Sequence, residues 1–522
     1  MGLRNELRGD VLIYGAVSGV GRSAPAHGVL AVLGVILLLL STAVQAQGAD
    51  PQTPPTPTPT PTPTPSPSPE ASGEALEAPT PEPTPGQEVE TVPEATPTPT
   101  PESDDEGAAK PVEGFNLNAY PETARLPPKQ KWRSFKQGVR GLLVWDFFDS
   151  RLTIRAQARL QVDGTAARAD SSLQEVTGAL GESLDVRRLQ LFAQGTIAHR
   201  MRYSISFTFG GSTGFGDIFV EGRDHGLNIF GYRVGQFRVG QFQEPFSFEQ
   251  VMSSYYTGFL ERSLPVWTFS PGNNIGYMVY DTTKSKRMTW ALGFFSWGQA
   301  NEANASNSVL SVTSRVTWLP VYRDNGLKLF HLGGSISSRT PSGSVQYRSR
   351  PEARFVPYFV DTGQFDASRI NLYGIEVVGL NGPFSFQSEA ILSEVKGTDY
   401  GNLSLWGGYV EVGYFLTDDH RSYDTGMGVF SRVTPKRDHH GFFRKKPGGA
   451  LELTGRVSNI DLTDGGLNGG QMIDYSLGVN WYMSPTTAVK FNYIYSDVKD
   501  GGHANILVLR FQFRPIPVPG WR

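Results

Sequence analysis

The sequence of 522 residues contains no cysteine. This absence excludes disulfide scaffolds, thiolate zinc sites, iron–sulfur clusters, cysteine nucleophiles and a lipid-modified N-terminal cysteine. Helical patterning is also missing, because no amphipathic helix of ordinary length can be found from about Gly138 onward. Glycine, with 59 residues, and aromatic residues, at 11%, are instead abundant. The composition therefore favours many short strands and turns over a helical enzyme.

The apolar run near the N-terminus is too short for a membrane-spanning helix. It extends for twelve residues, from Val29 to Leu40, whereas a spanning helix needs ~20. Three arginines precede it, and small residues follow at Val44 and Ala46. This order is typical of a cleaved secretory signal peptide, which we predict over residues 1–46. An uncleaved membrane anchor is the alternative.

Basic residues are absent from residues 47–109, which carry twelve Asp/Glu and many Pro-Thr and Pro-Ser repeats. Such a segment cannot bury apolar surface, so we predict a disordered, acidic, extended linker. A connecting segment, 110–137, follows it. The remainder of the chain, from residue 110 to 522, holds 44 Lys/Arg and 36 Asp/Glu, a net charge of +8. A preference for anionic partners is therefore expected of this part of the chain.

Period-two alternation of apolar and polar residues dominates the chain after residue 138. In residues 152–163, Leu152, Ile154 and Leu160 share one face, and Thr153, Arg155 and Arg159 share the other. Similar segments cover residues 202–209, 310–318 and 507–513. Alternation of this kind fits either a half-buried soluble sheet or a membrane barrel.

Three observations favour the barrel. The chain is predicted to be exported, and its alternating segments have the ~10 residues of a tilted membrane strand. Aromatic residues gather near strand ends, as in an interfacial girdle; they include Trp290, Phe294, Phe295, Trp297, Trp481, Tyr482, Tyr493 and Tyr495. At ~23 residues per strand and connection, the segment holds ~16 strands, enough for a water-filled lumen. We predict an all-β transmembrane antiparallel barrel over residues 138–514, followed by a tail, 515–522.

An apolar face toward lipid places the polar face, with its arginines, in the lumen. The candidate pore-lining residues that attract anions are Arg151, Arg155, Arg159, Arg188, Arg202 and Arg315. Guanidinium groups along a pore attract anions, and their planar forks suit phosphate oxygens. Alternatively, these arginines pair with lumenal carboxylates such as Asp163, Glu389 or Glu411 and only brace the barrel.

A stretch of about thirty residues without clean alternation separates Phe242 from Ile275. It is too apolar and aromatic for disorder, and long loops in compact structures are commonly functional. We predict that it folds into the barrel as a constriction; an extracellular cap is the alternative. The candidate constriction residues are Gln243, Glu244, Phe246, Phe259, Glu261 and Arg262.

Several motifs, in this order, resemble those of the phosphate-selective porin O and P family. They are VGQFQEPFSFEQ (239–250), FLERSLP (259–265), PGNNIG (271–276), RPEARFVPYFVDTG (350–363), GIEVVGLNGPFSFQSEA (374–390), GYFLTDDHRSYD (413–424), GRVSNIDLTDGGLNGG (455–470) and LGVNWYMSP (477–485). The double arginine Arg187 and Arg188 also fits the family. The resemblance implies a homotrimeric sixteen-stranded channel in a Gram-negative outer membrane, inserted into lipid by the barrel-assembly machinery. It also implies permeation by phosphate, polyphosphate or other inorganic anions.

The sequence departs from the family pattern in the predicted constriction. Gln243 stands where the family often has lysine, and Arg262 is the one basic residue between Pro245 and Tyr277. A selective phosphate site would need several converging cations. The departure therefore bears on phosphate specificity and leaves the channel prediction intact.

The leading hypothesis is a passive anion porin without enzyme activity, metal, cofactor or nucleic-acid partner. A weakly selective general diffusion porin is the runner-up. Two other classes stay open: a barrel enzyme, and a structural barrel whose linker contacts the cell wall. For the enzyme, His331 comes closest to a histidine on an apolar strand face.

Overall fold

A computed structural model describes residues 143–147, 151–210, 213–222, 227–229, 232–298, 308–437 and 448–514. The predicted signal peptide, acidic linker, connecting segment and C-terminal tail lie outside these described residues. No helix within the described residues is long and apolar enough to cross a membrane.

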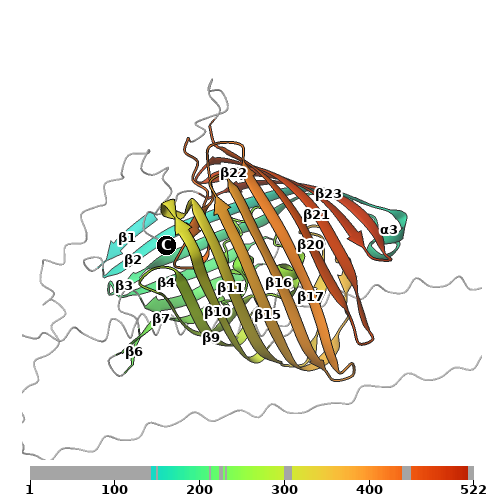
Figure 1. Ribbon diagram of the computed structural model, residues 1–522, viewed down its shortest axis with the longest axis horizontal. Helices are drawn as coiled ribbons and strands as arrows, with labels where there is room; N and C mark the ends of the chain where they lie inside the picture. Colours follow the sequence, from blue (N-terminus) through green and yellow to red (C-terminus); the bar gives the residue numbers. More distant parts are fainter. Residues whose placement is uncertain are drawn as a thin grey trace, which may run out of the picture. The chain divides into compact units, whose positions relative to one another are not determined.

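Sixteen antiparallel strands form a closed barrel, because each pairs with the next and β23 pairs with β2 (Figure 1). This confirms the predicted fold. The strands are β2 (Leu152–Ala169), β3 (Glu182–Ile197), β4 (Met201–Phe209), β5 (Gly214–Gly222), β7 (Tyr232–Gln243), β8 (Asn273–Thr282), β9 (Met288–Gly298), β10 (Ser308–Arg323), β11 (Lys328–Pro341), β15 (Phe365–Asn381), β16 (Phe384–Gly397), β17 (Asn402–Phe415), β20 (Ala450–Asp464), β21 (Leu467–Ser484), β22 (Thr487–Val498) and β23 (Gly502–Phe513).

Short elements complete the barrel at its ends. β1 (Leu143–Phe147) pairs with residues 152–156 of β2, on the edge that β23 leaves open beyond Leu160. β6 (Leu227–Ile229) forms a hairpin with β7. Helix α3 (Ser171–Thr177) connects β2 to β3, and its N-cap Asp170 accepts a hydrogen bond from the backbone N–H of Leu173. The 3₁₀ turn η1 (Asp324–Gly326) joins β10 to β11.

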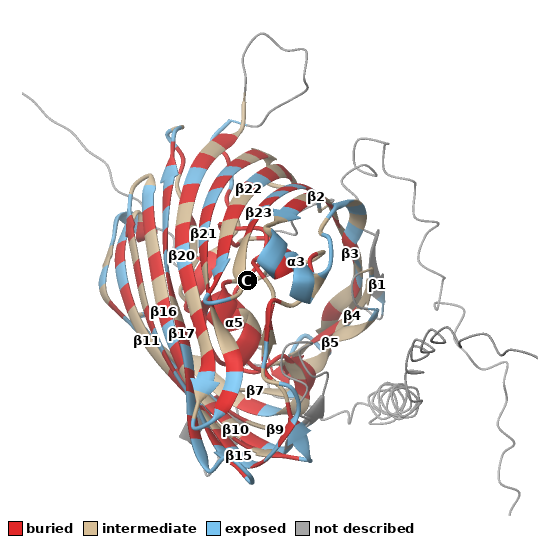
Figure 2. Cartoon of the chain, turned by 90° about the vertical axis from the view of Figure 1, so that its right-hand side faces the viewer, coloured by how far each residue is buried: buried red, intermediate tan, exposed pale blue. Residues whose placement is uncertain are grey.

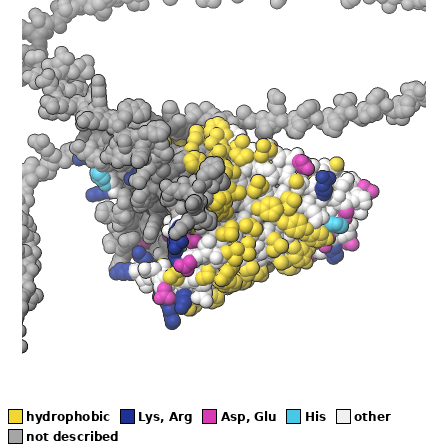
Figure 3. All heavy atoms as spheres, turned by 90° about the horizontal axis from the view of Figure 1, so that it is seen from above, with side chains coloured by type: hydrophobic (Ala, Val, Ile, Leu, Met, Phe, Trp, Pro, Cys, Tyr) yellow, Lys and Arg dark blue, Asp and Glu magenta, His cyan; other side chains and the backbone are white. Residues whose placement is uncertain are grey.

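The two faces of each strand differ as the alternation predicts. On β23, Leu507, Leu509 and Phe511 are exposed, whereas Arg510 and Gln512 are buried inside. Figure 3 shows hydrophobic side chains spread over the outer surface in view, with charged side chains nearer its ends. The girdle prediction is wrong for Phe295 and Tyr482. Both are buried on the inward face; Phe295 packs against Phe242, and Tyr482 donates to Glu452.

A β-bulge interrupts the alternation in β3. Arg188 pairs with Gln161 of β2, but Val186 already pairs with Val162, so Arg187 is an extra residue in the ladder. A bulge of this kind turns the strand and re-aims a side chain. As a result, both Arg187 and Arg188 face the lumen.

Three segments fold into the barrel. The inward loop, residues 244–272, connects β7 to β8 and contains α4 (Phe248–Val251) and α5 (Leu264–Phe269), which lies inside the ring of strands (Figure 2). Residues 342–364 contain β12 (Ser344–Val345), β13 (Arg348–Ser349) and β14 (Val360–Asp361). Residues 416–437 contain β18 (Ser422–Asp424) and β19 (Val429–Ser431). The inward position predicted for the first of these segments is thus observed.

The inward segments fill the lumen unevenly. Their apolar core, which includes Phe246, Leu264, Phe269 and Tyr347, packs against buried residues of β15 to β17 and β20 to β23. Inward-facing residues of β16, β17 and β20 to β23 are almost all buried. On β3 and β4, by contrast, Arg188, Gln190, Gln194, Thr196 and Thr208 are only half-buried. A solvated part of the lumen therefore lies along β2 to β4, and a cavity lined by Asp217, Arg238 and Tyr280 continues it along β5, β7 and β8.

Candidate functional site

The inward loop is attached to the barrel wall at its first turn. The Glu244 carboxylate accepts hydrogen bonds from Arg339 of β11 at 2.9 and 3.0 Å and from Asn274 of β8. The loop is attached again at Phe248, four residues after Glu244. There, Glu389 of β16 accepts hydrogen bonds from the backbone N–H groups of Phe248 and Glu249, both at 2.8 Å. These N–H groups begin α4 and would otherwise lack acceptors. Glu389 of the wall and the N-cap residue Ser247 of the loop, which accepts from the Gln250 N–H, thus cap the short helix together.

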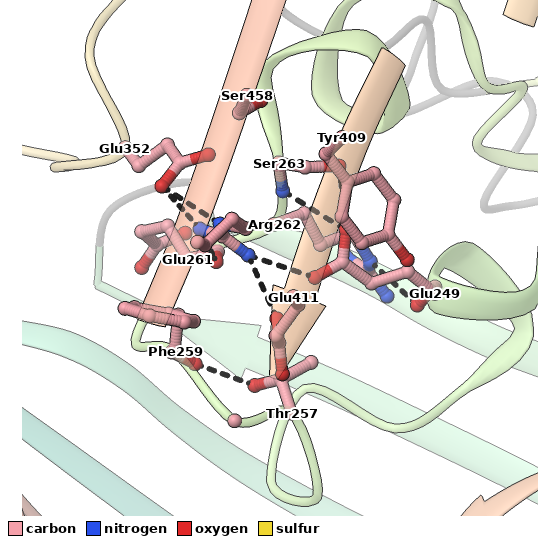
Figure 4. A network of polar contacts seen from close by, with 12 residues as sticks. Glu249, Thr257, Phe259, Glu261, Arg262, Ser263, Glu352, Tyr409, Glu411 and Ser458 are labelled. Carbon is pink, nitrogen blue, oxygen red and sulfur yellow. Dashed lines mark hydrogen bonds and ion pairs between the residues drawn. The ribbon is translucent and has the colours of Figure 1, made fainter. Parts of the chain in front are cut away.

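Arg456 of β20 is the central anchor of the loop, and its carboxylate partners Glu249, Glu352 and Glu411 are labelled in Figure 4. Its guanidinium is fully buried and contacts the carboxylates of Glu352, Glu249 and Glu411 at 2.5, 3.2 and 3.4 Å. It also donates to the backbone carbonyl of Glu261 and lies 4.3 Å from the Phe259 ring centroid. Burial raises the pKa of Glu352 above its usual range, although Arg456 opposes this shift. Arg456 therefore joins the inward loop, the segment 342–364 and two strands.

A second buried network holds the C-terminal half of the loop. Glu261 forms a bidentate pair with Arg187 at 2.7 and 2.8 Å and contacts Arg510 of β23 at 2.6 Å. Arg510 in turn forms a bidentate pair with Asp163 of β2. Desolvation alone would raise the pKa of Glu261, but the guanidiniums of Arg187 and Arg510 outweigh it and hold this pKa well below its usual range. Two carboxylates and two guanidiniums balance one another here.

Wall residues also bind the backbone of the loop directly. Lys490 of β22 donates to the Thr257 carbonyl at 2.6 Å, and Asn480 of β21 donates to the Gly258 carbonyl at 2.7 Å. Arg421, from the segment 416–437, pairs with Glu452 of β20 at 2.8 Å and donates to the Tyr256 carbonyl. Lys490 therefore helps to hold the loop.

The predicted constriction residues mostly serve this attachment. Gln243 ends β7, and Glu244 and Glu261 bind wall arginines. Phe246 and Phe259 are fully buried. Arg262 donates to the carbonyls of Glu249, Gln250 and Met252 within the loop itself. These six residues shape the loop, and its one arginine is directed at its own backbone.

The predicted pore arginines separate into groups. Arg202 pairs with Glu221 at 2.7 Å, and Arg315 pairs with Glu376 at 2.8 Å. Arg315 also donates to the carbonyls of Met427 and Gly428 in the segment 416–437. These two arginines thus brace the structure, with partners other than the three carboxylates proposed from the sequence. Arg151 is exposed in the turn before β2.

The three other predicted arginines are half-buried and lie on β2 and β3; they are Arg155, Arg159 and Arg188. We call the side of the inward loop that faces β2 and β3 its open side. Arg159 lies over the Phe192 ring at 4.4 Å and near the Tyr255 ring at 5.2 Å. Arg188 donates to the Gln161 side chain at 3.1 Å. Within the described parts of the chain, neither Arg159 nor Arg188 forms an ion pair with a carboxylate. Arg159 and Arg188 are thus cations on one side of the lumen without a directly paired carboxylate, and the carboxylates that act on them are Asp217 and Glu261.

Further residues of this side were not identified from the sequence. Arg514 follows β23 and donates to the Tyr256 hydroxyl at 2.7 Å and to Gln157 at 3.2 Å. Burial would raise the pKa of Tyr256, but the guanidiniums of Arg514, Arg159 and Arg432 together outweigh burial and lower this pKa. Arg514 directly follows Phe513, the last residue of the final strand, and this position could have indicated from the sequence that Arg514 lies at the end of the barrel. Arg432 and Tyr255 carry no local pattern that would have indicated their position.

His331, the residue nearest to an enzyme motif, faces inward. It is fully buried, and its ring nitrogens lie 2.6 Å from the Tyr423 hydroxyl and 3.3 Å from Glu376. It therefore does not lie on the lipid-facing surface, where the enzyme alternative would require it.

Comparisons with known proteins agree with this architecture. The family model described as phosphate-selective porin O and P matches residues 154–514. Porin O of Pseudomonas aeruginosa is 22% identical over 386 residues, covering 66% of this chain and 83% of that protein. An uncharacterized protein of Caulobacter vibrioides is 24% identical over 390 residues, covering 71% and 72%. Among solved structures, an anion-selective porin from Comamonas acidovorans matches with a TM-score of 0.43 at 11% identity, covering 70% of this chain and 99% of that one. The match over most of the chain shows that this protein belongs to the phosphate-selective porin O and P family of outer-membrane β-barrel channels.

Proposed function

We propose that this porin is an anion-preferring diffusion channel, with phosphate and polyphosphate among its inorganic permeants. The observation that carries the proposal is the arginine-rich open side of the inward loop. Arg159, Arg188 and Arg514 gather there without a carboxylate ion pair in the described residues. In a lumen narrowed by three segments, such charges raise the local concentration of anions and lower that of cations.

The arginines that form ion pairs are not the source of the proposed selectivity. Arg315 pairs with Glu376, and Arg202 shares the Glu221 carboxylate with Arg238, so these arginines present less net charge to permeating ions than arginines without an ion pair. The constriction loop adds no net cation either, since Arg262 lies beside Glu249 and Glu261. The selectivity is therefore assigned to the wall of β2 and β3 and to the end of β23. The expected working assembly is the homotrimer implied by the family.

Charge reversal on this wall tests the proposal. Arg155→Glu combined with Arg159→Glu should move the zero-current potential in a potassium chloride gradient toward the cation limit. The purified porin would be measured in planar bilayers, with the current in phosphate solution recorded alongside. A matched control reverses the same number of charges at two exposed positions, Lys284→Glu in a turn with Arg323→Glu at the end of β10, and should leave the potential nearly unchanged.

An unchanged potential in the double variant would show that these arginines do not control permeation. A wild-type channel with a weak or cationic potential would instead make it a general diffusion porin. Absence of conductance would favour the structural-barrel alternative.

A further inference from the structure

The most unusual feature of the open side is the aromatic surrounding of its arginines. The Arg159 guanidinium lies between the Phe192 ring of β3 and the Tyr255 ring of the inward loop. Next to it, Arg514 donates to the hydroxyl of Tyr256. We call these five residues the aromatic–arginine niche. Its cations thus contact aromatic side chains and form no ion pair in the described residues, whereas Arg456 and Arg510 contact carboxylates.

Hydrogen-bonding groups in the niche lack partners. The Nε atoms of Arg159 and Arg514 and the hydroxyl of Tyr255 are shielded from solvent and have no hydrogen-bond partner in the described residues. Tyr255 is 5% exposed. Buried polar groups are nearly always satisfied, so orphaned donors in one place indicate a ligand or water that completes them. Burial raises the pKa of Tyr255 to about 12, so its phenol stays a neutral donor at neutral pH.

The chemistry of these groups distinguishes between anions. Guanidinium edges bind the two oxygens of a carboxylate in one plane, and guanidinium faces stack on aromatic rings. An anion with two or more charges loses more hydration free energy than a singly charged one on entering a site lined by rings. A singly charged carboxylate attached to an aromatic ring loses less hydration free energy than such an anion, and its ring gains contact with Phe192, Tyr255 and Tyr256.

We propose that the niche selects monocarboxylates that carry an aromatic ring, in preference to inorganic phosphate. This inference rests on the proposed anion channel and names the class of organic permeant that it favours. The carboxylate meets Arg159, Arg514 and the Tyr255 hydroxyl, while the ring lies against the aromatic side chains. Such anions reside longer in the constriction and therefore interrupt the chloride current.

The test compares block of the chloride current by benzoate, acetate and phosphate at equal ionic strength and pH 7. Acetate has the same head group without the ring, and phosphate has a different head group. We expect benzoate to block at a concentration about 5- to 10-fold lower than either. Benzyl alcohol, a neutral molecule with the same ring, should not block, which controls for partition into the bilayer.

Variants assign the effect to the niche. Phe192→Leu should reduce the advantage of benzoate over acetate while preserving the anion-selective potential. Tyr255→Phe keeps the ring and removes the hydroxyl, so it should weaken block by both carboxylates equally. Both substitutions conserve the approximate size of the side chain, and circular dichroism together with unit conductance would establish that each barrel is folded.

The outcomes separate this inference from the proposed function. Equal block by benzoate and acetate, or stronger block by phosphate, in a channel that remains chloride-selective would overturn the niche and keep the anion porin. Benzoate block that persists in Phe192→Leu would also overturn it. A cation-selective wild-type channel would remove both proposals.

Discussion

The two sides of the inward loop carry similar charged residues with opposite consequences. On the side of β16, β17 and β20 to β23, arginines such as Arg456 and Arg510 are buried against carboxylates. On the side of β2 and β3, Arg159 and Arg188 are half-buried and form no ion pair in the described residues. The first group holds the loop in place, and the second faces the solvated lumen.

The proposed function therefore assigns selectivity to particular arginines and not to the arginine content of the barrel as a whole. A guanidinium that lies within a few ångströms of a carboxylate presents little net charge beyond its immediate surroundings. Such a guanidinium instead holds its partner segment in place, and removing one member of the pair destabilises the fold because it leaves a buried charge uncompensated. Stability and selectivity should therefore respond to different arginines of the same barrel.

The largest expected effect is loss of the anchor at Arg456. Arg456→Met would leave Glu249, Glu352 and Glu411 buried without their shared guanidinium. We expect a loss of about 3–5 kcal/mol in the free energy of unfolding, the range for breaking buried ion pairs. The loop should also detach in part and increase single-channel conductance. Urea unfolding in detergent micelles and planar-bilayer recording measure the two effects.

The control for this variant is Arg369→Met, which makes the same substitution at an exposed residue of β15. It should unfold within about 0.5 kcal/mol of the wild type. Equal stability of Arg456→Met and Arg369→Met would contradict the assignment of Arg456 as the anchor.

A smaller effect, with a defined pH dependence, is expected at Glu261. Its pKa is held well below the usual value by Arg187 and Arg510, against desolvation. A lowered pKa in the folded state stabilises the protein above the unfolded pKa of about 4.3, and this stabilisation is lost as the pH falls toward the folded pKa. Glu261→Gln should therefore be less stable than the wild type by about 2–3 kcal/mol at pH 7.

The difference between Glu261→Gln and the wild type should stay constant from pH 7 to about pH 5 and shrink only below about pH 4. Unfolding curves at five pH values between 3 and 7 test this. A difference that already disappears between pH 6 and pH 5 would show that the carboxylate is not held by the two arginines.

Much of the barrel could be predicted from the sequence because strand faces alternate with a period of two. That rule placed Leu509 outside and Arg510 inside, and it needs no knowledge of distant residues. The inward loop was predictable because residues 244–272 lose alternation and are too apolar for a solvated loop. Phe295 and Tyr482 show the limit of the rule, since an aromatic residue near a strand end can also face the lumen.

The charge partners could not be predicted, because they come from residues far apart in the chain. Arg456 and Glu249 are separated by 207 positions, and Arg510 and Asp163 by 347. The sequence suggested Asp163, Glu389 and Glu411 as partners for the pore arginines. The structure directs them to Arg510, to the backbone of α4 and to Arg456. Sequence order contains no information that would select among these pairs.

The sharpest and smallest test uses two consecutive residues with different environments. Arg187 is buried and paired with Glu261, whereas Arg188 is half-buried, donates to the Gln161 side chain and forms no ion pair among the described residues. Arg187→Gln should lower stability by about 2–3 kcal/mol and leave the zero-current potential near that of the wild type. Arg188→Gln should change stability by no more than about 0.5 kcal/mol and shift the potential toward cations.

The shift caused by Arg188→Gln should also depend on salt. Charges that face water are screened, with a Debye length of about 10 Å at 0.1 M and about 3 Å at 1 M ionic strength. The difference in potential between this variant and the wild type should therefore be clear at a mean concentration of 0.1 M and much smaller at 1 M. The stability difference of Arg187→Gln should persist at both concentrations, since its pair is shielded from solvent. A change in stability without a change in potential for both variants would contradict this assignment. Arg187 and Arg188 would then both be structural, and the selectivity would have to reside in Arg159 and Arg514.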